Sequence, residues 1–228
     1  MSKRLALVWV LLLLAALAAS AGDVAQFVNL GFSKDARYFM FGQFGITENE
    51  STAWAHTFIV DVRANVFVPR GTTEFAGAKP VDPGGNGLGA LLNALSAGLP
   101  RTNQYRIDHL STGRLLYVLL DGAEAANVLE FRDFQTGRSY TVTLTQLPAA
   151  GAAGASFNIS IGVTEKDGTT RSFTAGDLGY RRKGVKSYHI KQIILATDGA
   201  SLIFIVQKQV QDTRGDNIRY MVETARPK

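Results

Sequence analysis

The densest group of charged side chains outside the N-terminus lies in the segment 179–191, where five cations occur among thirteen residues. Guanidinium and ammonium groups bind carboxylates and phosphates, and the planar guanidinium does so through paired hydrogen bonds. Read as a loop, this segment could therefore hold an anionic headgroup, a phosphate or an acidic glycan. A solvated basic loop without a ligand is the other interpretation. The candidate anion- or partner-binding residues are Arg181, Arg182, Lys183 and Lys186.

Two stretches resemble nucleotide-binding motifs but lack required features. The sequence GYRRKGVKS at 179–187 is close to a phosphate loop, yet Val185 separates the glycine from the lysine. That loop needs its lysine at a fixed position after the glycine. The sequence GNGLGA at 85–90 matches a dinucleotide fingerprint, which needs a buried strand directly before it. Two prolines precede it at 80–83 instead, so we predict a flexible loop leading into a helix and no cofactor.

The sequence contains no recognisable catalytic or metal-binding motif. His56, His109 and His189 occur at no spacing typical of metal ligands, and the chain has no cysteine. A serine triad is compatible with the residue inventory, but no Gly-x-Ser-x-Gly elbow is present. We therefore assign no catalytic residue and no metal site.

Aromatic residues are concentrated in the first 60 positions and mostly alternate along predicted strands, which favours core positions for most of them. A surplus on an outer face would form a stacking platform for sugars or peptides. These residues are Phe27, Phe32, Tyr38, Phe39, Phe41, Phe44, Trp54 and Phe58.

The first 21 residues have the three parts of an export signal. Lys3 and Arg4 precede fifteen apolar residues at 5–19, and the small-x-small site at 19–21 predicts cleavage before Gly22. A retained membrane anchor is the alternative, although a spanning helix needs about 20 apolar residues. We expect no transmembrane anchor after cleavage and a location in the periplasm or outside the cell.

Composition excludes several classes of protein. The 228 residues are 46% apolar and 19% charged, as in ordinary globular chains. Without residues 1–21, 22 basic side chains face 19 acidic ones, a formal charge of +3 that does not indicate a nucleic-acid binder. The absence of cysteine means that no disulfide stabilises this exported chain. About 200 residues can bury a sufficient core without one.

Periodicity predicts a mainly β fold with many hairpins, in which residues 22–228 form a single domain. Asp-Gly and Thr-Gly turns separate many of the strands. One helix is predicted at 88–99 from its leucine spacing, with Pro100 ending it. A loop at 70–86 precedes the helix, so residues 70–104 form a loop-helix insertion. The predicted strands are 25–32, 37–44, 53–62, 66–68 (ended by Pro69), 105–110, 114–120, 127–133, 138–146, 156–164, 169–175, 188–195, 201–210 and 218–224.

One hairpin recurs in the sequence. Residues 28–41 align with residues 191–204 at an offset of 163, and Asp35 aligns with Asp198 in the turn. This strand-turn-strand pattern resembles the inner hairpin of β-propeller blades of the TolB and WD-repeat kind. We therefore expect antiparallel hairpins in either a small propeller-like arrangement or a two-sheet sandwich.

The chain as a whole resembles an uncharacterised family of predicted secreted bacterial proteins, catalogued as a domain of unknown function. The resemblance is carried by residues 27–33, 38–43, 131–137 and 188–224 and spans nearly all of the mature chain. It implies an exported bacterial protein, and it implies no activity, cofactor or catalytic residue.

Three functional hypotheses follow. The first is an exported, non-catalytic β protein that binds an envelope component or a protein partner, with the segment 179–191 as the contact. The second is an exported hydrolase whose site is assembled from loops, which requires His109 or His189 within about 3.2 Å of a carboxylate and a hydroxyl. The third is a carbohydrate-binding module with exposed, coplanar aromatic rings.

Overall fold

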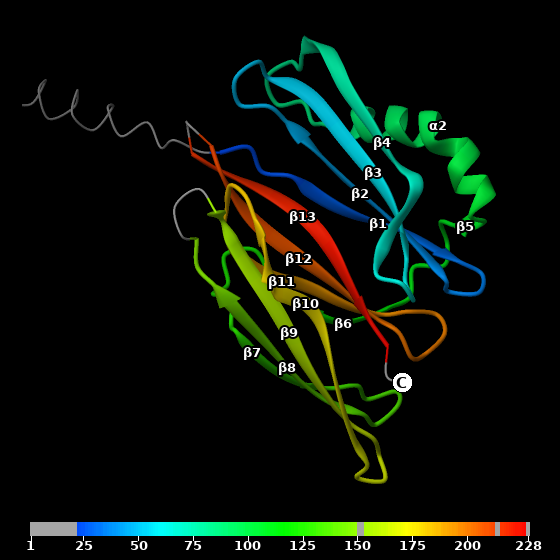
Figure 1. The fold of residues 1–228 in the computed structure, drawn as a ribbon. Helices are drawn as coiled ribbons and strands as arrows, with labels where there is room; N and C mark the ends of the chain where they lie inside the picture. Colours follow the sequence, from blue (N-terminus) through cyan, green and yellow to red (C-terminus); the bar gives the residue numbers. More distant parts are fainter. Residues whose placement is uncertain (1–21, 150–152, 213–214, 227–228) are drawn as a thin grey trace, which may run out of the picture.

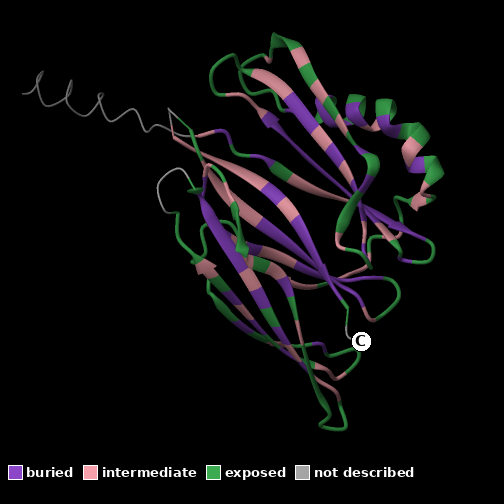
Figure 2. Ribbon diagram, viewed as in Figure 1, coloured by how far each residue is buried: buried purple, intermediate pink, exposed green. Residues whose placement is uncertain are grey.

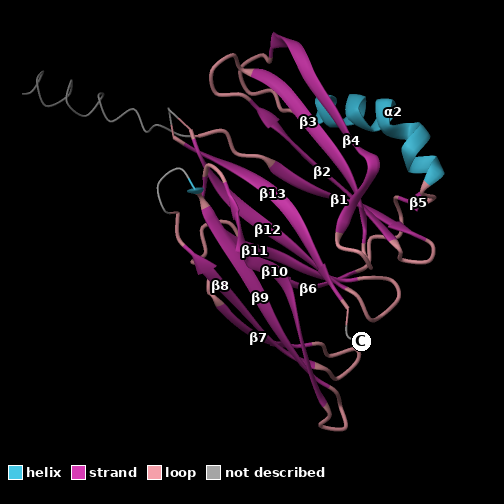
Figure 3. Ribbon diagram, viewed as in Figure 1, coloured by secondary structure: helices cyan, strands magenta, loops and turns pink. Residues whose placement is uncertain are grey.

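The computed structural model describes residues 22–149, 153–212 and 215–226, which form three antiparallel sheets and the helix α2 (Figure 1). The predicted signal peptide, residues 1–21, lies outside the described residues. Figure 3 shows that strands dominate the fold, as the sequence predicted.

The first sheet is a meander of the N-terminal strands with one short strand added from farther along the chain. Its order is β4-β3-β2-β1-β5. The predicted strand 105–110 is reduced to the two residues of β5. The strands are β1 (Gln26–Ser33), β2 (Tyr38–Ile46), β3 (Thr52–Asp61), β4 (Val66–Pro80) and β5 (Ile107–Asp108).

The remaining strands form a middle sheet, of order β13-β12-β11-β6, and a third sheet, of order β10-β9-β8-β7. The middle sheet contains β6 (Arg114–Val118), β11 (Val185–Leu195), β12 (Leu202–Gln211) and β13 (Asp216–Ala225). The third sheet contains β7 (Val128–Arg132), β8 (Ser139–Leu147), β9 (Ala155–Thr164) and β10 (Thr170–Arg182).

The middle sheet is buried on both faces, because the other two sheets pack against it (Figures 1 and 2). Along β12, Leu202 and Phe204 belong to the core shared with the third sheet. Ile203 and Ile205 belong to the core shared with the first sheet. Side chains alternate between faces along a strand, so a strand covered on both faces reads as an uninterrupted apolar run.

The stacked sheets agree with the sandwich expectation, extended to three layers, and the propeller-like detail is not confirmed. The two aligned segments, 28–41 and 191–204, are both antiparallel hairpins. Their aspartates have similar roles, since Asp35 accepts a hydrogen bond from Ser33 and Asp198 accepts one from Ser201. The hairpins lie in the first and middle sheets, which pack face to face.

The prediction that Pro69 ends its strand is wrong. Strand β4 runs from Val66 to Pro80, and the pairing with β3 shifts register between Phe58 and Val60. Proline is compatible with edge strands and bulges, where its missing N–H is not needed. The chain accommodates Pro69 in this irregularity, so the predicted loop 70–86 is only a short connection after Pro80.

Helix α2 (Leu88–Gln104) covers the outer face of the first sheet and continues past Pro100, which sequence reasoning expected to end it. Its contact face carries the small residues Ala90, Ala94 and Gly98, so the helix lies close to the sheet. In the last turn Thr102 is buried, and its hydroxyl donates to the Gly98 carbonyl at 3.3 Å. Packing of this final turn outweighs the loss of one intrahelical bond at Pro100.

The segment predicted as a basic loop is largely strand. Arg181 and Arg182 end β10, and β11 begins at Val185. The chain turns at residues 183–184 and crosses there from the third sheet to the middle sheet. The four candidate cations are therefore held in different positions, described below.

Candidate binding cleft at the edge of the middle sheet

A cleft of about 330 Å³ opens along β13, the edge strand of the middle sheet. The turn before β4 forms one wall and the end of β10 forms the other, so the cleft lies between edges of all three sheets. It is lined by Phe41, Gln43, Phe58, Val60, Asn65, Val66, Phe67, Tyr180, Arg182, Lys208, Tyr220, Met221, Val222 and Glu223.

Exposed aromatic rings flank this cleft. Phe67 is 52% exposed and Tyr180 is 61% exposed, although large aromatic side chains are usually more deeply buried. The Phe67 ring packs 5.4 Å from that of Phe58, which extends the apolar wall inward. The two rings come from the first and third sheets, so they present apolar surface from both sides of the cleft.

Arg182 is the cation at the end of β10, and half of its guanidinium is bonded. Its Nη2 donates to Glu223 Oε1 at 3.1 Å, and Glu223 Oε2 accepts from the Asn65 amide at 2.5 Å. The guanidinium carbon lies 4.9 Å from the Tyr180 ring centre, within range of a cation–π contact. Its Nη1 is buried and has no hydrogen-bond partner among the described residues.

Lys208 is a second, half-buried cation of the cleft, and its ammonium forms no hydrogen bond or ion pair with any described residue. Burial lowers the pKa of its ammonium group, and the charges of Arg182 and Arg219 lower that pKa further. Burying a charge without a partner is costly. An anion in the cleft would compensate for that cost.

The backbone of β13 also faces the cleft. Ile218 donates its N–H to Asp23 O at 2.9 Å, so its peptide groups point away from β12. Because this direction repeats every second residue, those of Tyr220, Val222 and Thr224 point the same way. Gln43 Oε1 accepts the Tyr220 N–H, and Asn65 Oδ1 accepts the Thr224 N–H.

Between these two side-chain caps lies Val222, a buried residue (7% exposed), whose peptide unit we call open because no described group bonds to it. Its outward N–H has no partner within the part of the chain that the structure describes, and Val222 lines the cleft. Unpaired peptide groups on an edge strand are sites for pairing with another chain. The cleft thus combines two cations, apolar walls and one open peptide unit.

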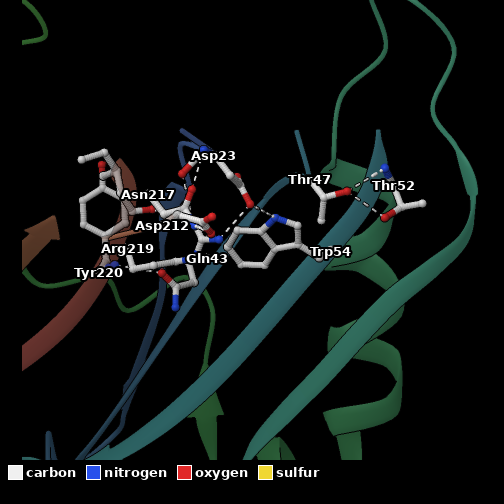
Figure 4. A network of polar contacts seen from close by, with 10 residues as sticks. Asp23, Gln43, Thr47, Thr52, Trp54, Asp212, Asn217, Arg219 and Tyr220 are labelled. Atoms are coloured by element: carbon white, nitrogen blue, oxygen red, sulfur yellow. Dashed lines mark hydrogen bonds and ion pairs between the residues drawn. The ribbon is translucent and has the colours of Figure 1, made fainter. Parts of the chain in front are cut away.

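A polar network secures the other end of β13 (Figure 4). Asp23 Oδ2 accepts from Trp54 Nε1 at 2.9 Å and from Arg219 Nη2 at 2.8 Å. The Arg219 guanidinium carbon lies 4.3 Å from the Trp54 ring centre. Asn217 accepts from the Asp23 N–H at 2.7 Å. This network ties the segment next to the predicted cleavage point to the first and middle sheets.

Of the four candidate residues from the sequence, the structure places only Arg182 in the cleft. Arg181 donates to the carbonyls of Pro148 and Gly154, which anchors the connector before β9. Lys186 pairs with Asp216 at 2.5 Å. Lys183 is exposed at the turn between β10 and β11. They are therefore not one cluster.

Sequence reasoning missed Lys208, Asn65, Phe67 and Tyr180 as cleft residues. A signal for Lys208 was available, since it is the charged residue in the otherwise uncharged strand β12. For the others no local signal exists, because only the stacking of the three sheets brings their elements together.

The described histidines do not form the geometry that the hydrolase alternative requires. His109 Nδ1 lies 2.6 Å from the Leu30 carbonyl. His189 borders a depression of about 560 Å³ near residues 119–125, and burial lowers its pKa. Within the described chain, neither histidine contacts both a carboxylate and a hydroxyl. No group of metal-ligating side chains is found among the described residues.

The aromatic residues proposed as a sugar platform are not exposed. Phe32, Phe39, Phe41, Phe44 and Trp54 are buried. The other three of the eight are partly buried. The exposed rings at the cleft, Phe67 and Tyr180, lie outside that group.

Comparison with known proteins places the chain in a family. The family model described as "Predicted secreted protein (DUF2259)" matches residues 40–226, most of the chain. No curated protein and no solved structure matches it. Within the described ranges, no helix combines the length and apolarity needed to cross a membrane. The protein is thus an exported member of the DUF2259 family of predicted secreted proteins.

Proposed function

We propose that this protein binds an envelope component or a protein partner without catalysing a reaction, and that the partner occupies the cleft along β13. The observation that carries this proposal is the ammonium of Lys208, which lies between apolar walls and has no partner among the described residues. Partial burial of a cation without a partner is unfavourable for folding. The Lys208 ammonium, unpaired in the described chain, is explained if a ligand supplies the negative charge that pairs with it.

The chemistry of the cleft favours binding over catalysis. Its carboxylate, Glu223, is engaged by Arg182 and Asn65. Its other polar groups are cations, amides and tyrosines, which recognise anions and peptide groups. Arg182 remains the contact predicted from the sequence, now together with Lys208, Phe67 and Tyr180.

The proposal is tested by capturing partners from the envelope of the host with the exported, affinity-tagged protein. We expect Lys208→Met and Phe67→Ser to reduce the captured material at least fivefold, because each removes one feature of the cleft. Lys183→Gln is the matched control, since it removes an equal charge from the exposed turn outside the cleft.

Equal capture by the wild type and both cleft variants would refute the proposal. Circular dichroism and thermal melting of each variant establish that the fold is retained, so that lost capture reports lost contact. Selective loss in Lys183→Gln would instead move the contact to the turn.

A further inference from the structure

We infer that the cleft binds a short, extended peptide segment of alternating apolar and acidic residues, which pairs with the open peptide unit of Val222 and places a carboxylate between Lys208 and Arg182. This inference rests on the proposed function and names the class of its ligand. It is carried by the backbone edge, the incompletely paired cations and the two chemically different walls of the cleft.

The backbone edge sets the conformation and length of the ligand. An extended peptide can add to an exposed edge strand through main-chain hydrogen bonds. Along β13 the side chains of Gln43 and Asn65 already occupy the N–H groups on both sides of Val222. Pairing is therefore limited to about one residue of the ligand, which excludes a long added strand.

The two cations, one of them paired through only part of its guanidinium, set the charge of the ligand. Arg182 Nη1 is buried without a partner, and Lys208 is likewise unpaired among the described residues. Glu223 offsets one positive charge, so one charge stays uncompensated in the lining of the cleft. A carboxylate supplies the missing negative charge and accepts hydrogen bonds from both cations.

The outward carbonyl of Val222, which has no partner in the described ranges, favours a peptide over a phosphate. A peptide residue alongside Val222 offers one donor and one acceptor, which match its outward carbonyl and N–H. A phosphodiester or a dianionic phosphomonoester offers only acceptors, so the Val222 carbonyl would face another oxygen. We therefore commit to a peptide carboxylate, and binding of phosphate is an outcome of the test.

The two walls of the cleft predict that acidic and apolar side chains alternate along the ligand. Lys208 has the same parity along β12 as Phe204 and Val206, so it faces the third sheet, where Arg182 ends β10. Phe58 and Phe67 form the wall of the first sheet. Side chains of an extended segment point alternately to opposite sides. One side therefore meets the cations and the other meets the aromatic wall.

The experiment measures binding of short capped peptides to the purified, exported protein by calorimetry at low salt. The test peptide is acetyl-Val-Glu-Val-amide, and the comparison peptide has Gln in place of Glu. We expect the Glu peptide to bind at least tenfold more tightly, because only it carries the carboxylate. N-methylation of the peptide bond that pairs with Val222 should weaken binding by a similar factor.

Protein variants test the assignment of the cations. Lys208→Met should reduce the preference for Glu over Gln to less than threefold, whereas Lys183→Gln should leave it unchanged. Because Lys208→Met removes a half-buried ammonium that has no partner among the described residues, we expect its melting temperature to equal or exceed that of the wild type. The loss of preference would then not reflect unfolding.

Three results would overturn the inference: equal affinity for the two peptides, an unchanged preference in Lys208→Met, or binding of inorganic phosphate or an oligouronate in preference to the peptide. In each case, cleft-dependent capture from the envelope would still support the proposed function. If capture is also independent of the cleft, the proposed function fails as well.

Discussion

At the scale of single residues, Asp133 is a buried carboxylate outside the cleft that depends on several hydrogen bonds. Its side chain is almost fully buried at the start of the turn between β7 and β8. It accepts hydrogen bonds from the guanidinium of Arg114 and from Thr136 and the Gln135 N–H. Arg114 begins β6 of the middle sheet, so this pair connects the middle and third sheets.

The pair predicts an acid-sensitive contribution to stability. The hydrogen bond and charge of Arg114 hold the pKa of Asp133 well below its ordinary value. A lowered pKa in the folded state stabilises the protein above the unfolded pKa, about 4, and this contribution is lost as the pH falls further. Asp133→Asn should lower the free energy of unfolding by about 3 kcal/mol at pH 7.

Urea denaturation at pH 7 and at pH 3 checks this prediction. The difference in free energy of unfolding between wild type and Asp133→Asn should be smaller at pH 3, because part of the stabilisation by the wild-type carboxylate is already lost there. Asp167→Asn is the control. Asp167 is an exposed aspartate in a turn of the same sheet, and it accepts a hydrogen bond from the nearby Thr169 N–H. An equal effect of both substitutions at pH 7 would contradict the role of Asp133.

At the scale of elements, strand β1 depends on a bulge. The register between β1 and β2 shifts between Asn29 and Gly31, and Gly31 has φ +99°. A Cβ at this position would lie 2.2 Å from the Asp108 carbonyl oxygen. The bulge brings the backbone of β1 this close to Asp108, which belongs to β5.

Gly31→Ala should therefore cost about 3 kcal/mol of unfolding free energy, since it adds a backbone clash to the strain of a positive φ. Gly168→Ala is the matched control: its φ is +87°, and a Cβ there would meet nothing within 4 Å. Only the strain of about 1–2 kcal/mol is expected for it. Chemical denaturation measures both. Equal losses of unfolding free energy would show that the close approach to Asp108 adds no cost beyond the strain of the positive φ.

Some elements followed directly from local sequence, and others were decided by packing. The aspartate-containing turns at Asp35 and Asp198 were predictable, because each aspartate bonds to residues next to it in the chain. The effects of Pro69 and Pro100 were not. Beyond Pro69 the strand pairs again with β3, and beyond Pro100 the buried Thr102 contacts Met40 of the first sheet. These contacts outweigh the local preference to end the element.

At the scale of the whole molecule, the middle sheet connects two cores. Alternate residues of β12 are shared between them, so removal of either outer sheet would expose one apolar face of the middle sheet. Area removed from water contributes about 25 cal/mol per Å². We therefore propose that residues 22–228 behave as a single folding unit.

This proposal predicts coincident unfolding transitions. The sequence contains two tryptophans, of which Trp54 alone lies beyond the predicted signal peptide, at the core between the first and middle sheets. Its fluorescence and the far-ultraviolet circular dichroism, which reports all three sheets, should change at the same urea concentration. A drop in circular dichroism before any change of Trp54 fluorescence would show that the third sheet unfolds separately.

The sequence by itself predicted an export signal and determined the mainly β class, most strand positions and the family resemblance, because these depend on composition, periodicity and contiguous motifs. The tertiary structure decided which cations act together. Arg181, Arg182, Lys183 and Lys186 are neighbours in the chain, yet three of them have other positions, and Arg182 lies with Lys208 of β12. The physical reason is that alternation along a strand directs adjacent side chains to opposite faces. Sheet stacking then selects the faces that meet.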